Sequence, residues 1–296
     1  MPSPSPINGQ RILITGAAGR IGTALRRGLA RPGRVLRLLD IAPVDPAEPG
    51  ENVEIVQASF TDPDAIDAAC RDVDAVVHLG GRASEADWDT IRAVNIDGTA
   101  RVLEAVRGQG VARVVLASSI HAAGFRSRDD VSRDGVSRDG VSRDGVSRDG
   151  VTGGGSLPAD SSPRPDTFYG VSKAAVEALG SLYHSRFGID VTCLRIGAFR
   201  PRPLVPEDLA AWLSPADAVR LFEVCLRAQP AAFRILWGIS ANTRRWWSLS
   251  EAEAIGYHPE DDAERYARQI LTDGRFDPGE PRNHRVGGGF CTMPLG

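Results

Sequence analysis

Short apolar, β-rich runs alternate with helical patterns along the first two thirds of the chain. Strands are expected at residues 11–15, 35–39, 53–56, 75–79, 114–118 and 191–195, separated by helices near 21–29, 63–70, 88–106 and 167–187. Alternation at this spacing forms βαβ units, whose strands pair in parallel and are covered by helices on both faces. The pattern therefore predicts an α/β fold built on a doubly wound parallel sheet.

The remaining segments are expected to be additions to this sheet. Residues 1–9 resemble a flexible leader, and residues 198–296 form a small substrate lobe with helices near 215–227 and 260–271 and a strand at 233–237, so that 10–296 is a single domain. Four copies of Val-Ser-Arg-Asp-Gly lie within residues 126–155. One apolar residue in five cannot offset the entropy of ordering, so this insertion is predicted to be disordered. A tolerated repeat expansion is favoured over a lid or docking arm.

Composition excludes several classes of protein. The 296 residues include 35 Lys or Arg and 38 Asp or Glu, a net charge of −3 without a basic stripe, which argues against nucleic-acid binding. No apolar run approaches the roughly 20 residues that cross a membrane. The four cysteines are far apart, which fits neither a disulfide framework nor a metal site, and a reducing, cytoplasmic location is expected.

A glycine-rich turn, Thr15-Gly-Ala-Ala-Gly-Arg-Ile-Gly22, follows the first expected strand and opens the first helix. Gly16 and Gly19 allow the backbone to turn tightly and approach a pyrophosphate, whose charge then faces the helix N-terminus. Gly22 allows the helix to pack closely against the strand. In this strand–turn–helix context the motif predicts a Rossmann-type dinucleotide site.

Asp40 ends the second expected strand, about 20 residues after the glycine turn. A carboxylate at this point accepts hydrogen bonds from the adenosine ribose and repels a 2′-phosphate. NAD is therefore expected in preference to NADP. Arg20 and Arg37 are the residues able to reverse this preference, and a simple strand-end cap is the alternative role of Asp40.

Of the 35 cationic side chains, 34 are arginines, and Lys173 is the one lysine of the sequence. It follows Tyr169 by four residues at an expected helix start, so the two share a helix face. A nearby ammonium lowers the pKa of a phenol from its usual value near 10 and makes it usable in acid–base catalysis. Arginine is bulkier and directs its charge differently. With Ser118 or Ser119 at the end of the fifth strand, the pattern predicts a catalytic set of Ser119, Tyr169 and Lys173. The alternative is that Tyr169 and Lys173 are only an i,i+4 pair on the surface of a helix.

The chain resembles the extended short-chain dehydrogenase/reductases of the NAD-dependent epimerase/dehydratase superfamily, and more closely the bacterial uronate dehydrogenases. The motifs that carry the resemblance are Thr15–Gly22, His78-Leu-Gly-Gly81, Ala117-Ser-Ser-x-His121, Tyr169-Gly-Val-Ser-Lys173, Arg195-Ile-Gly197, Trp212-Leu-Ser214, Trp237-Gly-x-Ser-x-Asn242, Trp246-Trp247 and Gly289-Phe290. They run from the first strand almost to the C-terminus, interrupted by the repeat.

The resemblance implies NAD-dependent oxidation of a sugar acid at its anomeric carbon to a lactone. Tyr169 would be the general base, Ser119 would hold the reacting oxygen, and Lys173 would bind the nicotinamide ribose. Further cofactor contacts are implied at Arg20, Ile21, Ser59, Phe60, Leu79, Gly80, Gly81 and Ile196. Ser59 departs from the pattern, because the family has an acid there. No metal ion is implied.

The substrate side departs further from the resemblance. Contacts are implied at Ala83, Ser119, Ile120, His121, Tyr169, Ala198 and Phe290. Ala83, Ile120 and Ala198 stand where the uronate enzymes carry serine, asparagine and serine. The arginine that grips the substrate carboxylate falls at Glu207, so either Arg200 or Arg202 takes over this role or the substrate is not a uronate.

Two other functions compete with the sugar-acid dehydrogenase. A nucleotide-sugar epimerase or dehydratase would share the first two thirds of the chain, but the C-terminal lobe is short and residues 119–121 lack paired acids. A non-catalytic NAD-binding sensor would not need the Tyr169–Lys173 pair. His78 and Asn95 are expected to be structural. A homo-oligomer formed through two long helices, including that of Tyr169, is the expectation for this superfamily.

Overall fold

The structure is a computed structural model that describes residues 10–134, 156–271 and 276–296. The predicted leader and most of the predicted repeat insertion lie outside these ranges. Within them no helix is both long and apolar enough to cross a membrane.

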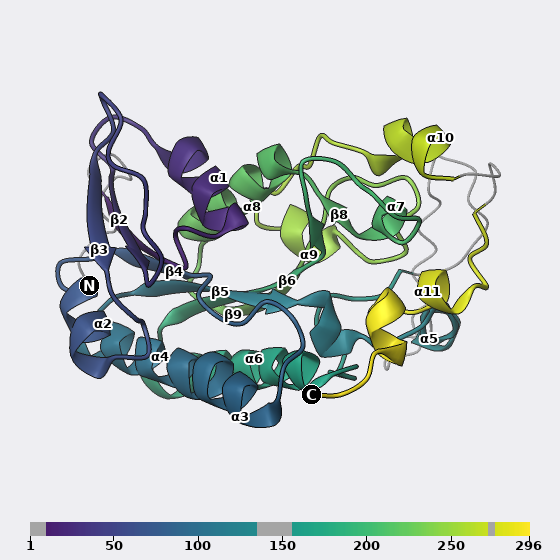
Figure 1. Cartoon of the computed structure of the whole chain (residues 1–296), viewed down its shortest axis with the longest axis horizontal. Coiled ribbons are helices and arrows are strands. Elements are labelled where there is room, and N and C mark those ends of the chain that lie inside the picture. The colour runs from purple at the N-terminus through teal and green to yellow at the C-terminus, as the bar shows by residue number, and fades with distance from the viewer. Residues whose placement is uncertain (1–9, 135–155, 272–275) are drawn as a thin grey trace.

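A parallel sheet forms the centre of the molecule (Figure 1). Among the described residues it has seven strands in the order β3-β2-β1-β4-β5-β6-β9. Their bounds are β1 Arg11–Thr15, β2 Val35–Asp40, β3 Val53–Gln57, β4 Ala75–His78, β5 Arg113–Ser119, β6 Asp190–Ile196 and β9 Phe233–Gly238. The order reverses direction between β1 and β4, which is the point where doubly wound sheets open a crevice for ligands. The predicted fold class is confirmed.

Helices cover both faces of the sheet, as Figure 1 shows. On one face lie α1 (Arg20–Leu29) and α8 (Pro215–Arg227), and on the other lie α2 (Pro63–Ala69), α4 (Gly98–Gly108) and α6 (Phe168–Phe187). Successive residues of β1 pack into opposite layers, Ile12 and Ile14 against one and Leu13 against the other. Successive residues of a strand point to opposite faces of the sheet, and here both faces are buried. Residues pointing either way must therefore be apolar, which explains the continuous apolar sequence of these strands.

The helix expected at 88–106 is interrupted. It consists of α3 (Trp88–Ile91), a π-helical segment (Arg92–Asp97) and α4. The buried Asn95 lies in the π-helical segment, accepts a hydrogen bond from Arg82 N (2.7 Å) and donates one to Ser172 Oγ (2.9 Å). The widened turn brings this amide between the loop after β4 and helix α6, which confirms its predicted structural role.

The C-terminal residues form a lobe of short elements beside the carboxyl ends of the strands. They comprise β7 (Ala198–Phe199), α7 (Asp208–Ala211), β8 (Trp212–Leu213), α9 (Ser250–Glu253), a 3₁₀ turn (Ala263–Tyr266), α10 (Ala267–Ile270), α11 (Pro281–His284) and a second 3₁₀ turn (Gly288–Thr292). The helix expected near 260–271 is therefore a 3₁₀ turn followed directly by the short helix α10.

The first residues of the predicted disordered insertion are ordered. Helix α5 covers Arg128–Asp134, and Arg128 Nε donates to the carbonyl of Asn283 (3.1 Å) while its guanidinium lies 5.1 Å from the ring centre of Trp246. Val131 packs against the main core. These contacts to distant segments supply the stabilisation that the local composition lacks, so the expected disorder does not hold for residues 126–134.

Candidate functional site

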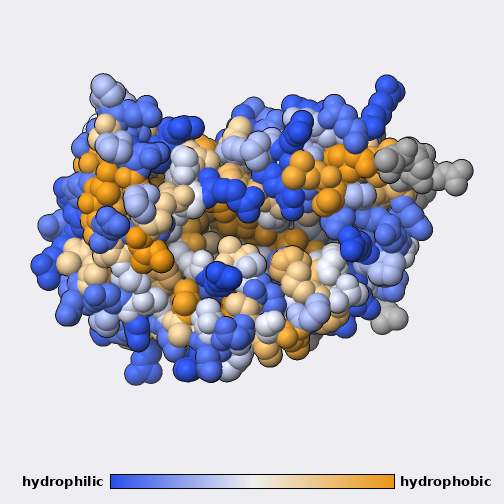
Figure 2. All heavy atoms as spheres, viewed as in Figure 1, coloured by the Kyte–Doolittle hydropathy of each residue, from blue (hydrophilic) through white to orange (hydrophobic). Residues whose placement is uncertain are grey.

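The carboxyl ends of the central strands open into a cleft of about 980 Å³. Figure 2 shows it as a hollow with an apolar floor, flanked by polar side chains. It runs from the glycine turn after β1 to the C-terminal lobe, and this position is where open α/β sheets bind their ligands. Of the sequence-predicted site residues, all line the cleft apart from Ser59 and Arg202, as judged from the described part of the chain.

The glycine turn leaves the N-terminus of α1 accessible from the cleft. Gly16 has a φ of 72°, and a Cβ added to it would lie 2.7 Å from the backbone nitrogen of Gly80. A Cβ at Gly22 would lie 2.5 Å from the carbonyl oxygen of Ala17. Both contacts are too close for any larger residue, so the backbone can approach a ligand at this turn as the motif predicts.

Asp40 is held at the edge of the cleft by backbone donors. Its two carboxylate oxygens accept hydrogen bonds from Ala18 N and Ala42 N, both at 2.9 Å. Arg37, by contrast, donates through Nε to Glu54 (2.7 Å) and through Nη1 to two backbone carbonyls on the far side of β2. Arg37 is therefore committed elsewhere and does not offset the charge of Asp40. Arg20 is exposed at the cleft rim.

Ser59 does not reach the cleft, in contrast to the expected cofactor contact. Its hydroxyl lies 2.7 Å from that of Thr61 and caps a turn before α2. The neighbouring Phe60 does reach the cleft, where its ring packs against Gly80, whose added Cβ would lie 2.6 Å from the ring. The turn directs the aromatic residue inward and the serine away.

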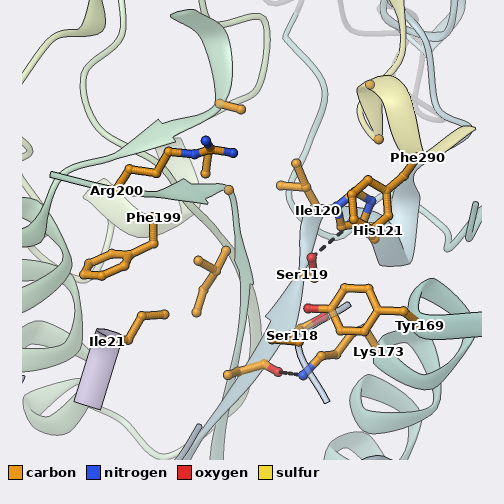
Figure 3. A pocket seen from close by; sticks show the side chains of 18 of the residues that line it. Ile21, Ser118, Ser119, Ile120, His121, Tyr169, Lys173, Phe199, Arg200 and Phe290 are labelled. Carbon is orange, nitrogen blue, oxygen red and sulfur yellow. Dashed lines mark hydrogen bonds between the residues drawn. The ribbon is translucent and has the colours of Figure 1, made fainter. Parts of the chain in front are cut away.

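Ser119, Tyr169 and Lys173 meet on the cleft floor (Figure 3). Ser119 ends β5, and α6 begins at Phe168 with the hydroxyl of Thr167 accepting from Gly170 N (3.0 Å). Tyr169 and Lys173 are one helical turn apart on the buried face of α6. Lys173 Nζ donates to the carbonyl of Ala117 (2.7 Å) and lies 5.5 Å from the centre of the Tyr169 ring.

Burial dominates the acid–base properties of this pair. It raises the pKa of Tyr169 to about 12, with the charge of Asp166 acting in the same direction and the Ser119 hydroxyl opposing it. Burial also lowers the pKa of Lys173 to about 8. Loss of solvation therefore dominates, and the net pKa of Tyr169 lies above the usual value of a phenol; the expected lowering by Lys173 stays a prediction.

The two candidate serines have different surroundings. Ser118 Oγ donates to Glu177 (2.7 Å), which forms a buried ion pair with Arg195 (2.8 Å). Successive residues of a strand point to opposite faces, so Ser119 is on the side of Tyr169 instead. The structure therefore places Ser119, as predicted, beside the phenol and Ser118 in a structural network.

His78 is structural, as expected. Its ring nitrogens lie 2.7 Å from the Thr15 hydroxyl and 3.1 Å from the Thr99 hydroxyl, and burial lowers its pKa to about 3. The ring is therefore neutral at physiological pH. It links β1, β4 and α4 beneath the glycine turn.

Two acidic residues of the site were missed by the sequence analysis. Glu85 accepts hydrogen bonds from Phe168 N (3.2 Å) and Tyr169 N (2.8 Å), which anchors the start of α6. Asp166 accepts from His121 Nδ1 at 2.7 Å. Asp166 precedes an expected helix, a position typical of capping acids, and this signal was available in the sequence. Glu85 lies in a loop and carried no local signal.

The substrate end of the cleft is formed by the loop after β5, the segment after β6 and the C-terminal lobe. Ala83, Ile120 and Ala198 give it apolar walls. Phe290 stacks on His121 with ring centres 4.0 Å apart and planes 28° apart. These residues meet as the resemblance implied, although they lie far apart in the sequence.

The two arginines that could bind a substrate carboxylate differ in their position relative to the cleft. Arg200 lines the cleft, with Nε 3.5 Å from the buried carboxylate of Asp208, and Figure 3 shows its guanidinium extending toward the side of His121 and Phe290. Arg202 is exposed, and among the described residues it is not part of the cleft wall. Glu207 does line the cleft.

Comparisons with known proteins agree with this geometry. A family model described as the NAD dependent epimerase/dehydratase family matches residues 12–200. The chain is 33% identical to a uronate dehydrogenase of Pseudomonas putida over 97% of both chains, and 36% identical to an NAD-dependent glucose-6-phosphate dehydrogenase of Haloferax volcanii over 87% of this chain and 95% of that one. A mutant uronate dehydrogenase of Agrobacterium tumefaciens complexed with NAD superposes with a TM-score of 0.82 at 34% identity, covering 97% of this chain and 98% of that one.

Proposed function

Because this chain belongs to the NAD-dependent epimerase/dehydratase family, we propose that it is an NAD-dependent dehydrogenase that oxidises a sugar acid at the anomeric carbon to a lactone. The observation that carries the proposal is the meeting of Ser119, Tyr169 and Lys173 in the cleft that begins at the glycine turn. A dinucleotide at the turn would direct its reactive end toward these residues.

The residues of the cleft fit NAD. The glycine turn accommodates a pyrophosphate where side chains would collide, Asp40 presents a carboxylate to the adenosine ribose, and Lys173 is positioned for the nicotinamide ribose. Asp40 together with the committed Arg37 supports NAD rather than NADP. When bound, NAD supplies the oxidant that accepts the hydride removed from the sugar.

Tyr169 is the proposed base. Ser119 donates to the anomeric oxygen, and the phenolate of Tyr169 takes the hydroxyl proton as the carbon–oxygen double bond of the lactone forms. The phenol is 8% exposed, so water is largely excluded from the proton transfer. A pKa of about 12 in the protein alone means that the phenolate needs further positive charge or hydrogen bonding within the assembled site.

Arg200 is the proposed anchor for the substrate carboxylate. Asp208 holds Nε of its guanidinium at 3.5 Å, which leaves the two terminal nitrogens directed across the cleft to bind a carboxylate in bidentate fashion. Glu207 would repel the substrate carboxylate, so Arg200 has to lie nearer to that carboxylate than Glu207 does. Arg202 is exposed and does not line the cleft, which favours Arg200 for this role.

The test is NADH formation from NAD with glucuronate, galacturonate and neutral aldoses, with the product identified as a lactone before it hydrolyses. Turnover of the uronates supports the proposal, whereas turnover of neutral aldoses alone, or retention of NAD without net NADH formation, contradicts it. Arg200→Gln should raise the KM for uronates at least about tenfold, the scale of one lost charge-assisted pair. Arg202→Gln, two residues away and exposed, is the matched control and should leave that KM unchanged.

A further inference from the structure

The ring of His121 is fixed on three sides at the reacting end of the cleft. Its Nδ1 lies 2.7 Å from Asp166 Oδ2, its face stacks on Phe290, and its edge meets the Tyr169 ring with centres 5.7 Å apart (Figure 3). The side chain of His121 is 14% exposed and lines the cleft. A ring held in this way has one direction left for its other nitrogen, Nε2, which is away from Asp166.

The carboxylate of Asp166 is itself immobile. Its side chain is fully buried, and the Thr167 hydroxyl donates to Oδ1 at 3.0 Å. Glycines surround it: a Cβ at Gly124 or Gly287 would overlap Oδ2, and one at Gly170 would lie 2.9 Å from Oδ1. The backbone therefore closes around the carboxylate, and within the described parts of the chain His121 donates to Oδ2 and Thr167 to Oδ1.

The chemistry of this contact selects the tautomer of the imidazole. An ionised carboxylate accepts hydrogen bonds and cannot donate them, so the proton of the neutral ring must be on Nδ1. Nε2 is then an acceptor without a proton. A ligand group opposite Nε2 must donate a hydrogen bond, and a sugar hydroxyl does so while a carboxylate does not.

We infer that Asp166 is a positioning residue that holds His121 as the Nδ1–H tautomer, and that Nε2 accepts a hydrogen bond from the sugar hydroxyl next to the anomeric carbon. The centres of the His121 and Tyr169 rings are 5.7 Å apart, so the histidine lies next to the proposed base. The inference rests on the proposed function and adds a requirement to it: the substrate carries a hydroxyl at C2. The substrate carboxylate binds elsewhere.

The first test does not depend on turnover. Nitrogen-15 NMR of the whole protein, with its histidines labelled and His121 assigned by its absence in His121→Gln, reports which ring nitrogen carries the proton. The neutral ring is expected to be protonated on Nδ1. In Asp166→Asn a single accepting oxygen faces two donors, Thr167 and His121, and the Nε2–H form should appear. Wild-type protein with the neutral ring protonated on Nε2 overturns the inference.

The second test uses the sugar. Asp166→Asn should raise the KM for glucuronate at least about tenfold more than it lowers kcat, because an N–H of His121 then faces the sugar hydroxyl. With 2-deoxyglucuronate the same substitution should have little effect. In a protein that already carries His121→Gln, Asp166→Asn should cause no further rise in KM, as expected of two residues that act through one contact. Equal losses on both sugars overturn the inference.

Asp217→Asn is the control for a merely structural effect. Asp217 is equally buried, but it lies in α8 and accepts from the backbone of Glu260 and Asp261. It should lower stability without changing the KM ratio of the two sugars. If no sugar is oxidised at all, the proposed function fails, while the NMR result still decides the tautomer of His121.

Discussion

Replacing Lys173 with methionine is expected to leave the protein as stable or more stable while abolishing its activity. Methionine has a similar length and fills the same space, but it removes the ammonium from a site that is 7% exposed. Burial lowers the pKa of Lys173 from 10.5 to about 8, so the charged form is less favourable in the folded protein than in the unfolded chain. Keeping a buried ammonium at this position therefore costs stability.

The magnitude follows from two opposing contributions. A pKa lowered from 10.5 to about 8 corresponds to roughly 3 kcal/mol of destabilisation at neutral pH, at about 1.4 kcal/mol for each pH unit. Methionine removes this cost of burying a charge. It also removes the hydrogen bond from Nζ to the carbonyl of Ala117, which contributes about 1–3 kcal/mol for a charged donor. We expect Lys173→Met to be more stable than the wild type by about 0–2 kcal/mol at pH 7.

The pH dependence distinguishes this explanation from a general packing effect. Below pH 8 Lys173 is charged in both the folded and unfolded states, and the full destabilisation is present. From pH 8 toward 10.5 the unfolded chain keeps a proton that the folded protein has released, so the stability of the wild type rises relative to the variant. Between pH 8 and pH 10 the difference should shift by about 2–3 kcal/mol and reverse in sign.

The assay is urea unfolding of both proteins at pH 7, 8, 9 and 10. Buried groups such as Cys70 and Cys225, whose pKa values are raised by burial, also titrate across this range, but they are present in both proteins and cancel in the difference. A difference in unfolding free energy that is the same at pH 7 and pH 10 would refute the reasoning. The difference in unfolding free energy between Lys173→Arg and Lys173→Met should be independent of pH, because a guanidinium does not titrate in this range.

Further substitutions test the base, the cofactor site and the insertion. Tyr169→Phe should lower kcat about 10²–10⁴-fold while NAD binding, followed by fluorescence titration, stays intact; normal turnover would exclude the proposed base. Gly16→Val should raise the KM for NAD at least about tenfold, since Gly16 has a positive φ and no room for a Cβ, and an unchanged KM would contradict the close approach. Asp40→Ser should raise kcat/KM for NADP relative to NAD, and no change would show that Asp40 does not face the ribose. Deleting residues 136–150, three whole repeats beyond α5, should leave turnover and the Tm within about 2 °C of the wild type, and a large loss of either would assign the repeat a structural or gating role.

The fold class and the position of the proposed catalytic pair were predictable because their signals are local. Apolar runs of strand length between helical patterns specify βαβ units wherever the chain places them, and the glycine turn identifies the strand that begins the dinucleotide site. The four-residue spacing of Tyr169 and Lys173 requires nothing beyond a helix to bring them to one face. In a chain that otherwise uses arginine, the one lysine pointed to the pair that we propose as catalytic.

Other properties of the site depend on segments that meet only in the folded chain. Asp166 reaches His121 across 45 positions, and Arg200 rather than Arg202 enters the cleft because Asp208 of a later helix holds it. The net pKa of Tyr169 is raised although an ammonium lies nearby, since a pKa responds to solvation as well as to a neighbouring charge. Periodicity and spacing are carried by neighbouring residues, whereas burial and hydrogen-bond partners come from the whole molecule. The sequence therefore located the residues that we propose as catalytic, and the tertiary contacts determined their burial, their hydrogen-bond partners and the direction in which each charged side chain points.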